Sequence, residues 1–321
     1  MEPGKSRFNA ESTAADVLRD VNLSGKLALV TGGGGGLGLE TARALAAAGA
    51  NVIIGGRSGP AIEAARIELA RDFPRSQFFG YALHLADLGS VETFARAVLG
   101  LGQSIDIYIA NAGIMAVPLS RNAAGHELHL ATNFLGHALL TSLLAPALKQ
   151  AGSSRVVVLS SSGHHFASVD LDDLDWRTRA YDKWLAYGQS KTACSLLAVH
   201  TAVTMRGAGV TALAVHPGVI ATGLMRHLQE EDYAALKTRT DIIPPKVRNR
   251  KTLAQGAATS VWAATAPELA GRIAYLEDCA VARVVDTPDT VSGVLAYALD
   301  PTLADRLMAT TERLIGRDLA F

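Results

Sequence analysis

The chain of 321 residues has only two cysteines, Cys194 and Cys279, which argues against a disulfide framework and favours a reducing compartment such as the cytoplasm. It has no net charge, because thirty basic residues balance thirty acidic ones, so bulk electrostatics gives no reason to expect nucleic acid or an anionic membrane as a partner. It also lacks an uncharged apolar run of membrane-spanning length, and its first residues lack the apolar centre of a signal peptide. With 49% apolar and 19% charged residues, the composition favours a globular cytoplasmic protein without a membrane span.

Strand-like and helix-like segments alternate from Lys26 onward. Continuous apolar runs such as LALV are typical of strands that are buried on both faces. We predict strands at 27–30, 51–56, 77–85, 105–110, 154–161 and 210–217, and helices at 39–48, 60–71, 87–99, 123–149, 187–206 and 253–265. This alternation predicts an α/β fold with a doubly wound parallel sheet of about seven strands, covered by helices on both faces.

The chain divides into a polar N-terminal extension, 1–24, and a single domain, 25–321. Ser12 or Thr13 is positioned to cap a short helix within the extension. The longest irregular stretch, 223–252, mixes apolar and charged residues and leaves the sheet after the last of these strands. Because connections of this length are usually functional or disordered, we predict that it forms a lid over a substrate.

Five consecutive glycines stand in the stretch TGGGGGLG, residues 31–38, directly after the first predicted strand and at the start of a helix. In open parallel sheets, ligands bind beyond the carboxyl ends of the strands, where a helix N-terminus offers free N–H groups to phosphates. Glycines allow the backbone to approach such a ligand closely. The position of this loop therefore predicts a bound dinucleotide on a Rossmann-type fold.

Further motifs follow in a fixed order. They are T-G-x-x-x-G-x-G from Thr31 to Gly38, Asn111-Ala112-Gly113, Asn133 within ATNFLGH, Ser160-Ser161-Ser162, Y-x-x-x-K from Tyr187 to Lys191, and His216-Pro217-Gly218 with Thr222 beyond it. Together they resemble the short-chain dehydrogenase/reductase (SDR) family. Longer stretches, such as GHELHLATNFLGHALLT and RVVVLSSSGHH, resemble its retinol-dehydrogenase/WW-domain-oxidoreductase branch and the bacterial relatives of that branch.

The resemblance implies a catalytic set of Asn133, Ser161, Tyr187 and Lys191. Tyr187 and Lys191 are four residues apart and share one face of a helix, so the ammonium can stabilise a phenolate during proton transfer. Ser161 is preferred over Ser160 and Ser162 because of its register in the family motif, and it would hold the substrate oxygen. Asn133 would hold a water molecule that links Lys191 to solvent.

The expected cofactor is NADP(H), with NAD(H) as a possible alternative. Gly56 stands where an acidic residue would bind the ribose of NAD, and Arg57 can grip a 2′-phosphate. His84 replaces an aspartate that the family usually places near adenine. The predicted cofactor-binding residues are Gly32, Gly36, Leu37, Gly38, Arg57, His84, Leu85, Asn111, Gly113, Tyr187, Lys191, Val219 and Thr222.

The reaction implied is interconversion of a carbonyl and an alcohol by hydride transfer, on a small apolar substrate. The candidate lining of its pocket is Met115, Phe166, Val219, Leu224 and Met225. The family also suggests a homo-oligomer, a dimer or a tetramer, built on the helices at 123–149 and 187–206. Two alternatives stay open, namely a sugar-nucleotide epimerase or dehydratase of the extended SDR type and a non-catalytic nucleotide-sensing protein on the same fold.

Other histidines in the sequence do not predict a metal site. His126-Glu127-Leu128-His129 lacks the spacing of the H-E-x-x-H motif, and we interpret it as an exposed helix turn. His164-His165 follows the serines without a G-x-S-x-G elbow, so an ordinary loop is expected there.

Overall fold

A central sheet organises the computed structural model, which describes residues 6–220, 230, 232, 250–287 and 292–321. Within these residues the sheet has eight strands in the order β3-β2-β1-β4-β5-β6-β7-β8. Their bounds are β1 (Leu27–Thr31), β2 (Asn51–Gly56), β3 (Phe78–Ala82), β4 (Ile107–Ala110), β5 (Arg155–Leu159), β6 (Thr211–His216), β7 (Tyr275–Glu277) and β8 (Ala280–Val281). All neighbours are parallel except β7 and β8. The predicted doubly wound sheet is confirmed, with two short strands at one edge that the sequence did not predict.

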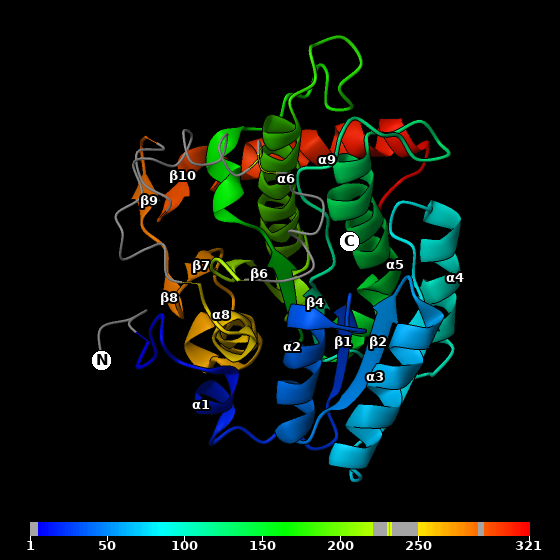
Figure 1. The fold of residues 1–321 in the computed structure, drawn as a ribbon, viewed down its shortest axis with the longest axis vertical. Helices are drawn as coiled ribbons and strands as arrows, with labels where there is room; N and C mark the ends of the chain where they lie inside the picture. The colour runs from blue at the N-terminus through cyan, green and yellow to red at the C-terminus, as the bar shows by residue number, and fades with distance from the viewer. Residues whose placement is uncertain (1–5, 221–229, 231, 233–249, 288–291) are drawn as a thin grey trace.

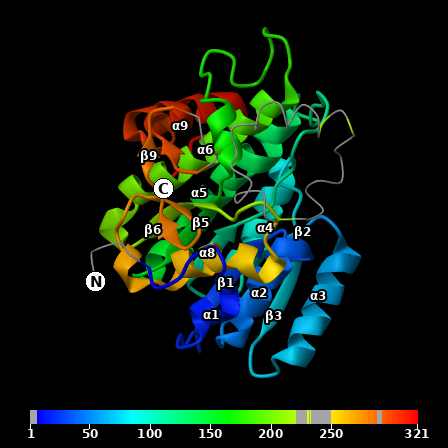
Figure 2. The same ribbon diagram turned by 60° about the vertical axis from the view of Figure 1, so that its left-hand side comes forward.

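Helices cover both faces of this sheet (Figures 1 and 2). One face carries α1 (Ala14–Leu18), α2 (Gly36–Ala47), α3 (Gly59–Asp72) and α8 (Leu253–Thr265). The other carries α4 (Leu88–Leu99), α5 (Gly136–Gln150) and α6 (Lys183–Thr204), and α9 (Pro301–Ile315) packs against α6. The order of strands reverses beside β1, whose neighbours are β2 and β4, so the loops after β1 and β4 diverge to opposite faces. A cleft at the carboxyl ends of these strands follows from that divergence.

Successive residues of the strands enter two separate hydrophobic cores. In β1, Leu29 belongs to the core under α4, α5 and α6, while Val30 belongs to the core under α2 and α8. Both side chains are fully buried, which explains why the strands read as continuous apolar runs. The stretch Leu130–Gln150 is long and apolar enough to cross a membrane, yet 83% of its most apolar window is buried within the protein. Burial in the first of these cores accounts for its hydropathy.

The N-terminal segment is less peripheral than its sequence suggests. Helix α1 begins after Thr13, whose side chain and that of Asp16 form a reciprocal capping box. Its residues Ala14, Val17 and Leu18 are buried, and the helix packs against α8. Although we interpreted 1–24 as a polar extension, its helix is part of the second core.

The predicted helix at 123–149 begins later than expected. Its first part forms a turn closed by an antiparallel bridge between Arg121 and Glu127. A π-helical turn, η1 (Leu130–Leu135), then leads into α5. The polar side chains of residues 126–129 turn inward rather than outward: His126, Glu127 and His129 are 7%, 0% and 0% exposed. The interpretation of this stretch as an exposed helix turn was therefore wrong, because buried partners from distant segments satisfy these groups.

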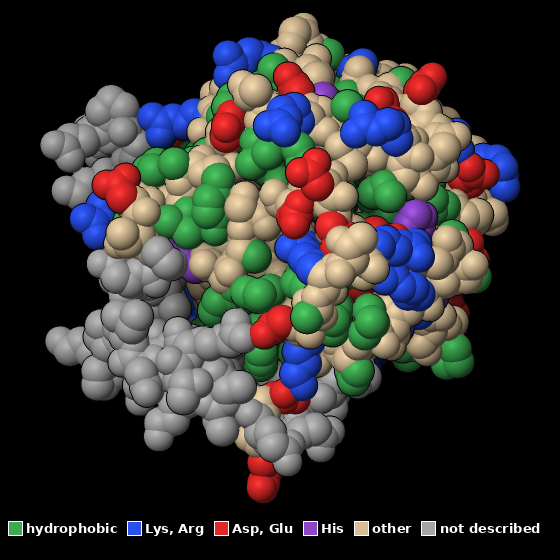
Figure 3. Space-filling model, turned by 90° about the horizontal axis from the view of Figure 1, so that it is seen from above, with side chains coloured by type: hydrophobic (Ala, Val, Ile, Leu, Met, Phe, Trp, Pro, Cys, Tyr) green, Lys and Arg blue, Asp and Glu red, His purple; other side chains and the backbone are tan. Residues whose placement is uncertain are grey.

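Two short parallel strands, β9 (Val284–Val285) and β10 (Val294–Leu295), form a separate small sheet near α9. On the described part of the surface seen from above, acidic and basic side chains are interspersed (Figure 3). The proposed lid at 223–252 lies outside the described residues apart from 230, 232 and 250–252.

Candidate active site

The glycine loop after β1 forms one wall of a cleft of about 780 Å³. Gly32 and Gly36 have φ values of +69° and +54°, in the left-handed region that disfavours side chains. A Cβ at Gly33 would overlap Cγ2 of Ile54, and one at Gly38 would lie 2.6 Å from Nδ2 of Asn111. At Gly35, in contrast, a Cβ would have no neighbouring atom within 4 Å, and this residue borders the cleft. Gly33 and Gly38 thus serve tight packing, whereas open space lies beside Gly35 and Gly36.

Helix α2 begins at Gly36 without a side chain that caps its free N–H groups. Since Gly34, Gly35, Gly36 and Leu37 line the cleft, these groups are available to an anion there. Both the open space and the uncapped helix fit the pyrophosphate of a dinucleotide.

The end of β2 forms another part of the cleft wall. Gly56, Arg57 and Ser58 line it, and the exposed guanidinium of Arg57 makes no hydrogen bond or ion pair with the other described residues. Leu85 also lines the cleft, whereas His84 is exposed and lies outside the lining. The structure therefore places Arg57 and Leu85 on the wall of the cleft and His84 outside it.

The N-A-G turn after β4 is joined to the glycine loop by Thr31. The Thr31 hydroxyl accepts hydrogen bonds from the backbone N–H groups of Asn111 and Ala112, each at 3.0 Å. The side-chain amide of Asn111 donates to the carbonyl oxygen of Thr31 at 2.8 Å. His137, the last residue of the ATNFLGH stretch, to which the sequence assigned no role, places Nε2 at 3.0 Å from the same hydroxyl. These contacts fix the loops after β1 and β4 relative to each other.

Ser161, Tyr187 and Lys191 meet at the other end of the cleft and line it. Lys191 is 5% exposed, donates from Nζ to the carbonyl oxygen of Leu159 at 2.9 Å, and lies 6.0 Å from the centre of the Tyr187 ring. The Ser161 hydroxyl oxygen accepts from the N–H of Gly163 at 3.0 Å, which leaves its proton free to be donated. The three side chains therefore lie together as the sequence motifs predict.

Ser160 is held in a different way. Its hydroxyl donates to the carbonyl oxygen of Lys191 at 2.9 Å and accepts from the hydroxyl of Ser195 at 2.8 Å. It is 3% exposed. Because these bonds commit the Ser160 hydroxyl to the interior, Ser161 is the better candidate to contact a substrate.

Asn133 lies behind the cleft, in the π-helical turn, and is fully buried. Its Oδ1 accepts from the N–H of Ile114 at 2.8 Å, and its Nδ2 donates to the carbonyl oxygen of Ile114 at 3.0 Å and to the hydroxyl of Ser190 at 2.9 Å. A Cβ at Gly113 would lie 3.1 Å from Oδ1 of Asn133 and 3.5 Å from Nζ of Lys191. Gly113 thus leaves space between the asparagine and the lysine, where the predicted water would have to lie.

His216 is a second residue to which the sequence alone assigned no role of its own. It lines the cleft, and its Nδ1 accepts from the N–H of Ser162 at 3.3 Å. Burial and the nearby ammonium of Lys251 lower the pKa of His216 to about 4, so the imidazole is neutral at pH 7. The sequence signal for a role of His216 in the cleft is its position directly before the P-G motif.

The remaining predicted residues are scattered. Val219 is 44% exposed and outside the lining, although its neighbours Gly218 and Ile220 border the cleft. Met115 and Phe166 are half-buried, and neither lines this cleft. Thr222, Leu224 and Met225 lie outside the described residues.

The other nucleophilic and imidazole groups nearby are part of the packing. Cys194 and Cys279 are free and buried, and burial raises the pKa of the Cys279 thiol to about 11. His164 is fully buried, where Nδ1 lies 2.7 Å from the carbonyl oxygen of Ser161, and burial lowers its pKa to about 3. No group of three or more metal-ligating side chains occurs among the described residues.

A glycine loop, an N-A-G turn and a Ser–Tyr–Lys set at the switch point of a doubly wound sheet define a dinucleotide-dependent oxidoreductase. The family model described as short chain dehydrogenase matches residues 26–233, and the chain belongs to this family. It is 46% identical over 291 residues to a "Probable oxidoreductase" of Streptomyces antibioticus, covering 89% of this chain and 96% of the relative. It is 40% identical to human retinol dehydrogenase 12, covering 81% and 80% of the two chains. The resemblance to the retinol-dehydrogenase branch is thereby confirmed.

Solved structures agree on the fold. An uncharacterized protein from Mycobacterium paratuberculosis superposes with a TM-score of 0.70 at 32% identity, covering 96% of this chain and 99% of the other. A protein described as an NAD(P)-dependent gluconate 5-dehydrogenase from Beutenbergia cavernae, with NADP bound at low occupancy, has a TM-score of 0.60 at 25% identity. That superposition covers 76% of this chain and 91% of the other. The chain is thus similar to NAD(P)-binding oxidoreductases along most of its length.

Proposed function

We propose that this protein is an NADP(H)-dependent oxidoreductase that interconverts a small apolar carbonyl compound and the corresponding alcohol. The observation that carries the proposal is one cleft with Arg57 at one end and Ser161, Tyr187 and Lys191 at the other. A dinucleotide is a ligand long enough to engage both ends. When bound, the nicotinamide supplies or accepts the hydride.

The choice of NADP(H) over NAD(H) rests on the end of β2. Gly56 presents no carboxylate there to bind the ribose hydroxyls of NAD or to repel a 2′-phosphate. Arg57 is exposed and has no partner among the described residues, so its guanidinium is free to form charge-assisted hydrogen bonds with such a phosphate. The uncapped start of α2 would hold the pyrophosphate.

In the reducing direction, the Tyr187 hydroxyl donates its proton to the substrate oxygen, and Ser161 donates a hydrogen bond to the same atom. The Lys191 ammonium faces the Tyr187 ring and stabilises the phenolate that remains. Lys191 itself is held by the carbonyl oxygen of Leu159, which limits the freedom of its long side chain. In the oxidising direction the same groups take the proton from an alcohol.

The substrate class is inferred from the wall beside Tyr187 and from the relatives. Ile114, Leu159 and Ile220 border the cleft near the reacting end, and one relative is named a retinol dehydrogenase. An apolar aldehyde, ketone or alcohol suits such a wall. The proposal also includes a homo-oligomer, as the family suggested.

The test is a screen of apolar ketones, aldehydes and alcohols with both cofactors, followed through the absorbance of the reduced nicotinamide. In the Tyr187→Phe variant, kcat should fall by about 10² to 10⁴, because general acid catalysis typically supplies that factor. NADPH binding, measured by fluorescence, should change little. Tyr108→Phe is the matched control, since it removes another buried phenol that lies in β4 away from the cleft lining. Turnover by Tyr187→Phe within a few-fold of wild type would refute the assigned chemistry.

A further inference from the structure

A polar cluster of the buried Glu127 and His129 with the half-buried Tyr181 lies beside the cleft without a part in the proposed chemistry. The side chains of Glu127 and His129 are 1% and 0% exposed. Oε1 of Glu127 accepts from Nδ1 of His129 at 2.7 Å and from the Tyr181 hydroxyl at 3.0 Å, and Oε2 accepts from the N–H of Leu130 at 2.8 Å. Burial alone would raise the pKa of Glu127, but the hydrogen bonds from His129 and from the backbone outweigh it and lower that pKa. The cluster therefore holds a buried carboxylate that hydrogen bonds keep ionised.

The contact made by the second ring nitrogen of His129 determines which of its two nitrogens bears the hydrogen. The N–H of Val117 donates to Nε2 of His129 at 3.2 Å, so this nitrogen is an acceptor and Nδ1 bears the hydrogen given to Glu127. The Tyr181 hydroxyl lies 3.1 Å from the carbonyl oxygen of Val117. The single proton of this hydroxyl goes either to Glu127 or to the Val117 carbonyl oxygen, so the cluster binds the N–H of Val117 through His129 and shares one donor between the other two groups.

Val117 ends a short segment, 114–117, that the site also holds from its other side. Ile114 gives its N–H and its carbonyl oxygen to the side chain of Asn133. Between the two, Ala116 adopts a φ of +52°, which L side chains rarely adopt and which persists only where surrounding contacts impose it. Because Ile114 lines the cleft, the conformation of this segment shapes the wall at the reacting end.

The same cluster contacts the catalytic tyrosine. The rings of His129 and Tyr187 are 6.1 Å apart between centres and inclined by 63°, an edge-to-face arrangement. His129 thus touches Tyr187 on one side and holds Val117 on the other.

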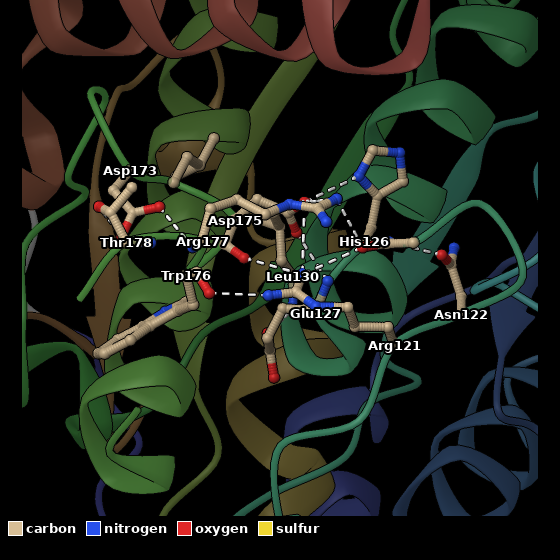
Figure 4. A network of polar contacts seen from close by, with 12 residues as sticks. Arg121, Asn122, His126, Glu127, Leu130, Asp173, Asp175, Trp176, Arg177 and Thr178 are labelled. Carbon is tan, nitrogen blue, oxygen red and sulfur yellow. Dashed lines mark hydrogen bonds and ion pairs between the residues drawn. The ribbon is translucent and has the colours of Figure 1, made fainter. Parts of the chain in front are cut away.

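An outer layer of charged groups fixes the backbone that carries Glu127. The N–H of Glu127 donates to Oδ1 of Asp175 at 2.7 Å, and Oδ2 of Asp175 accepts from Nε of Arg177 at 2.9 Å. Figure 4 shows His126 and Arg121 approaching the same region, where Arg121 donates to the carbonyl oxygen of Trp176 at 2.7 Å. The segment around Asp175 thereby ties the cluster to a loop that is more than forty residues away in the chain.

We propose that Glu127, His129 and Tyr181 are positioning residues of the active site, which hold the wall at 114–117 and the Tyr187 ring in the arrangement that the reaction requires. This inference rests on the proposed function for its kinetic consequence. None of the three residues lines the cleft, so their effect on catalysis passes through Val117 and Tyr187.

Tyr181→Phe is the variant that tests this, because it removes one hydroxyl from the cluster and leaves the ring. With Tyr108→Phe as the control, we expect kcat for the best substrate to fall about tenfold, since small displacements of reacting groups are costly. The affinity for NADPH should stay within twofold, because the glycine loop and Arg57 are untouched. A purely structural role would instead lower the melting temperature and leave kcat per folded enzyme unchanged. Glu127→Gln, which keeps the shape and removes the charge, should lower kcat in the same way.

Hydrogen–deuterium exchange supplies a readout that needs no turnover. In Tyr181→Phe, the peptide that spans 113–118 should exchange faster than in wild type, while peptides from α2 and β2 stay unchanged. Unaltered exchange there, or a kcat equal to that of wild type, would overturn the positioning role. If the wild-type protein reduces no carbonyl compound, the proposed function fails, and the exchange data alone then decide whether the cluster holds this wall.

Discussion

His137 should make the stability of this protein fall steeply as the solution becomes acidic. The imidazole is 1% exposed, accepts at Nε2 from the Thr31 hydroxyl, and donates from Nδ1 to the carbonyl oxygen of Asn133 at 2.9 Å. Burial and, to a smaller extent, the charge of Lys191 lower its pKa from 6.5 to about 4. In this environment both ring nitrogens are engaged by the neutral form, and a proton on Nε2 would leave the Thr31 hydroxyl without its acceptor.

The sign of the effect follows from the lowered pKa. The unfolded chain takes up a proton near pH 6.5 and the folded chain only near pH 4, so the contribution of His137 is complete above pH 6.5 and is lost as the pH falls toward 4. Each pKa unit corresponds to about 1.4 kcal/mol, so the loss is about 3 kcal/mol. That is a large part of the roughly 5 to 15 kcal/mol by which domains are typically stable, and His164 adds a loss of the same sign.

The assay is urea unfolding at a series of pH values between about 7.5 and 4.5, for wild type and for His137→Gln. The variant should be less stable at the upper end of this range by about 1 to 3 kcal/mol, because buried hydrogen bonds are lost. Its free energy of unfolding should also decline less steeply near pH 5, by about 1.4 kcal/mol per pH unit, since one proton fewer is taken up on unfolding. His84→Gln, at an exposed position, controls for the loss of an imidazole as such. Identical slopes for His137→Gln and wild type would refute the assignment of a buried, neutral imidazole.

Three further substitutions test the cleft. Gly38→Ala should abolish NADPH binding and destabilise the fold, because the methyl group would press on Asn111. Gly35→Ala should leave the melting temperature within a few degrees of wild type and still weaken NADPH binding. Equal NADPH affinities in the two variants would contradict this. Arg57→Ala should weaken NADPH binding by about ten- to a hundredfold, which is what one charged hydrogen bond contributes, and should weaken NADH binding much less. Measuring the dissociation constants of both cofactors for the variant and for wild type tests this. Gly113→Ala should lower kcat about tenfold, because its methyl group fills the space beside Lys191; full activity would show that this space is not used.

The sequence predicted the parallel sheet because its strands carry a strong and simple signal. Strands buried on both faces need continuous apolar runs, and LALV, NVIIGG and SRVVVLSS supply them. Helix α8 has the predicted bounds, since Thr252 and Gln255 form a capping box at its start. The edge hairpin of β7 and β8 was missed because Asp278 and Cys279 form its turn at φ values of +51° and +55°. Turns of this kind usually contain glycine or asparagine, which makes them recognisable in a sequence, and this turn contains neither.

The polar interior could not be predicted in the same way. Glu127 and His129 read as surface residues because their partners, Asp175 and Tyr181, are about fifty residues away in the chain. Thr31 and His137 are separated by 106 residues, and they meet only in the tertiary structure, where α5 brings His137 to the end of β1. Motif spacing located the groups that face the cleft, whereas the residues that hold those groups depend on the tertiary structure.

Asn133 illustrates how these two kinds of residue are connected. Its side-chain amide binds Ile114 and Ser190, and its backbone carbonyl oxygen, in the π-helical turn, accepts from Nδ1 of His137 and from the thiol of Cys194 at 3.1 Å. A π-turn leaves backbone groups without their regular helical partners, and here side chains replace those partners. An asparagine engaged at so many atoms acts first as a structural link between the wall of the cleft and the helix that carries Lys191. Any water that joins Lys191 to solvent would therefore have to share an Asn133 oxygen that already accepts a hydrogen bond.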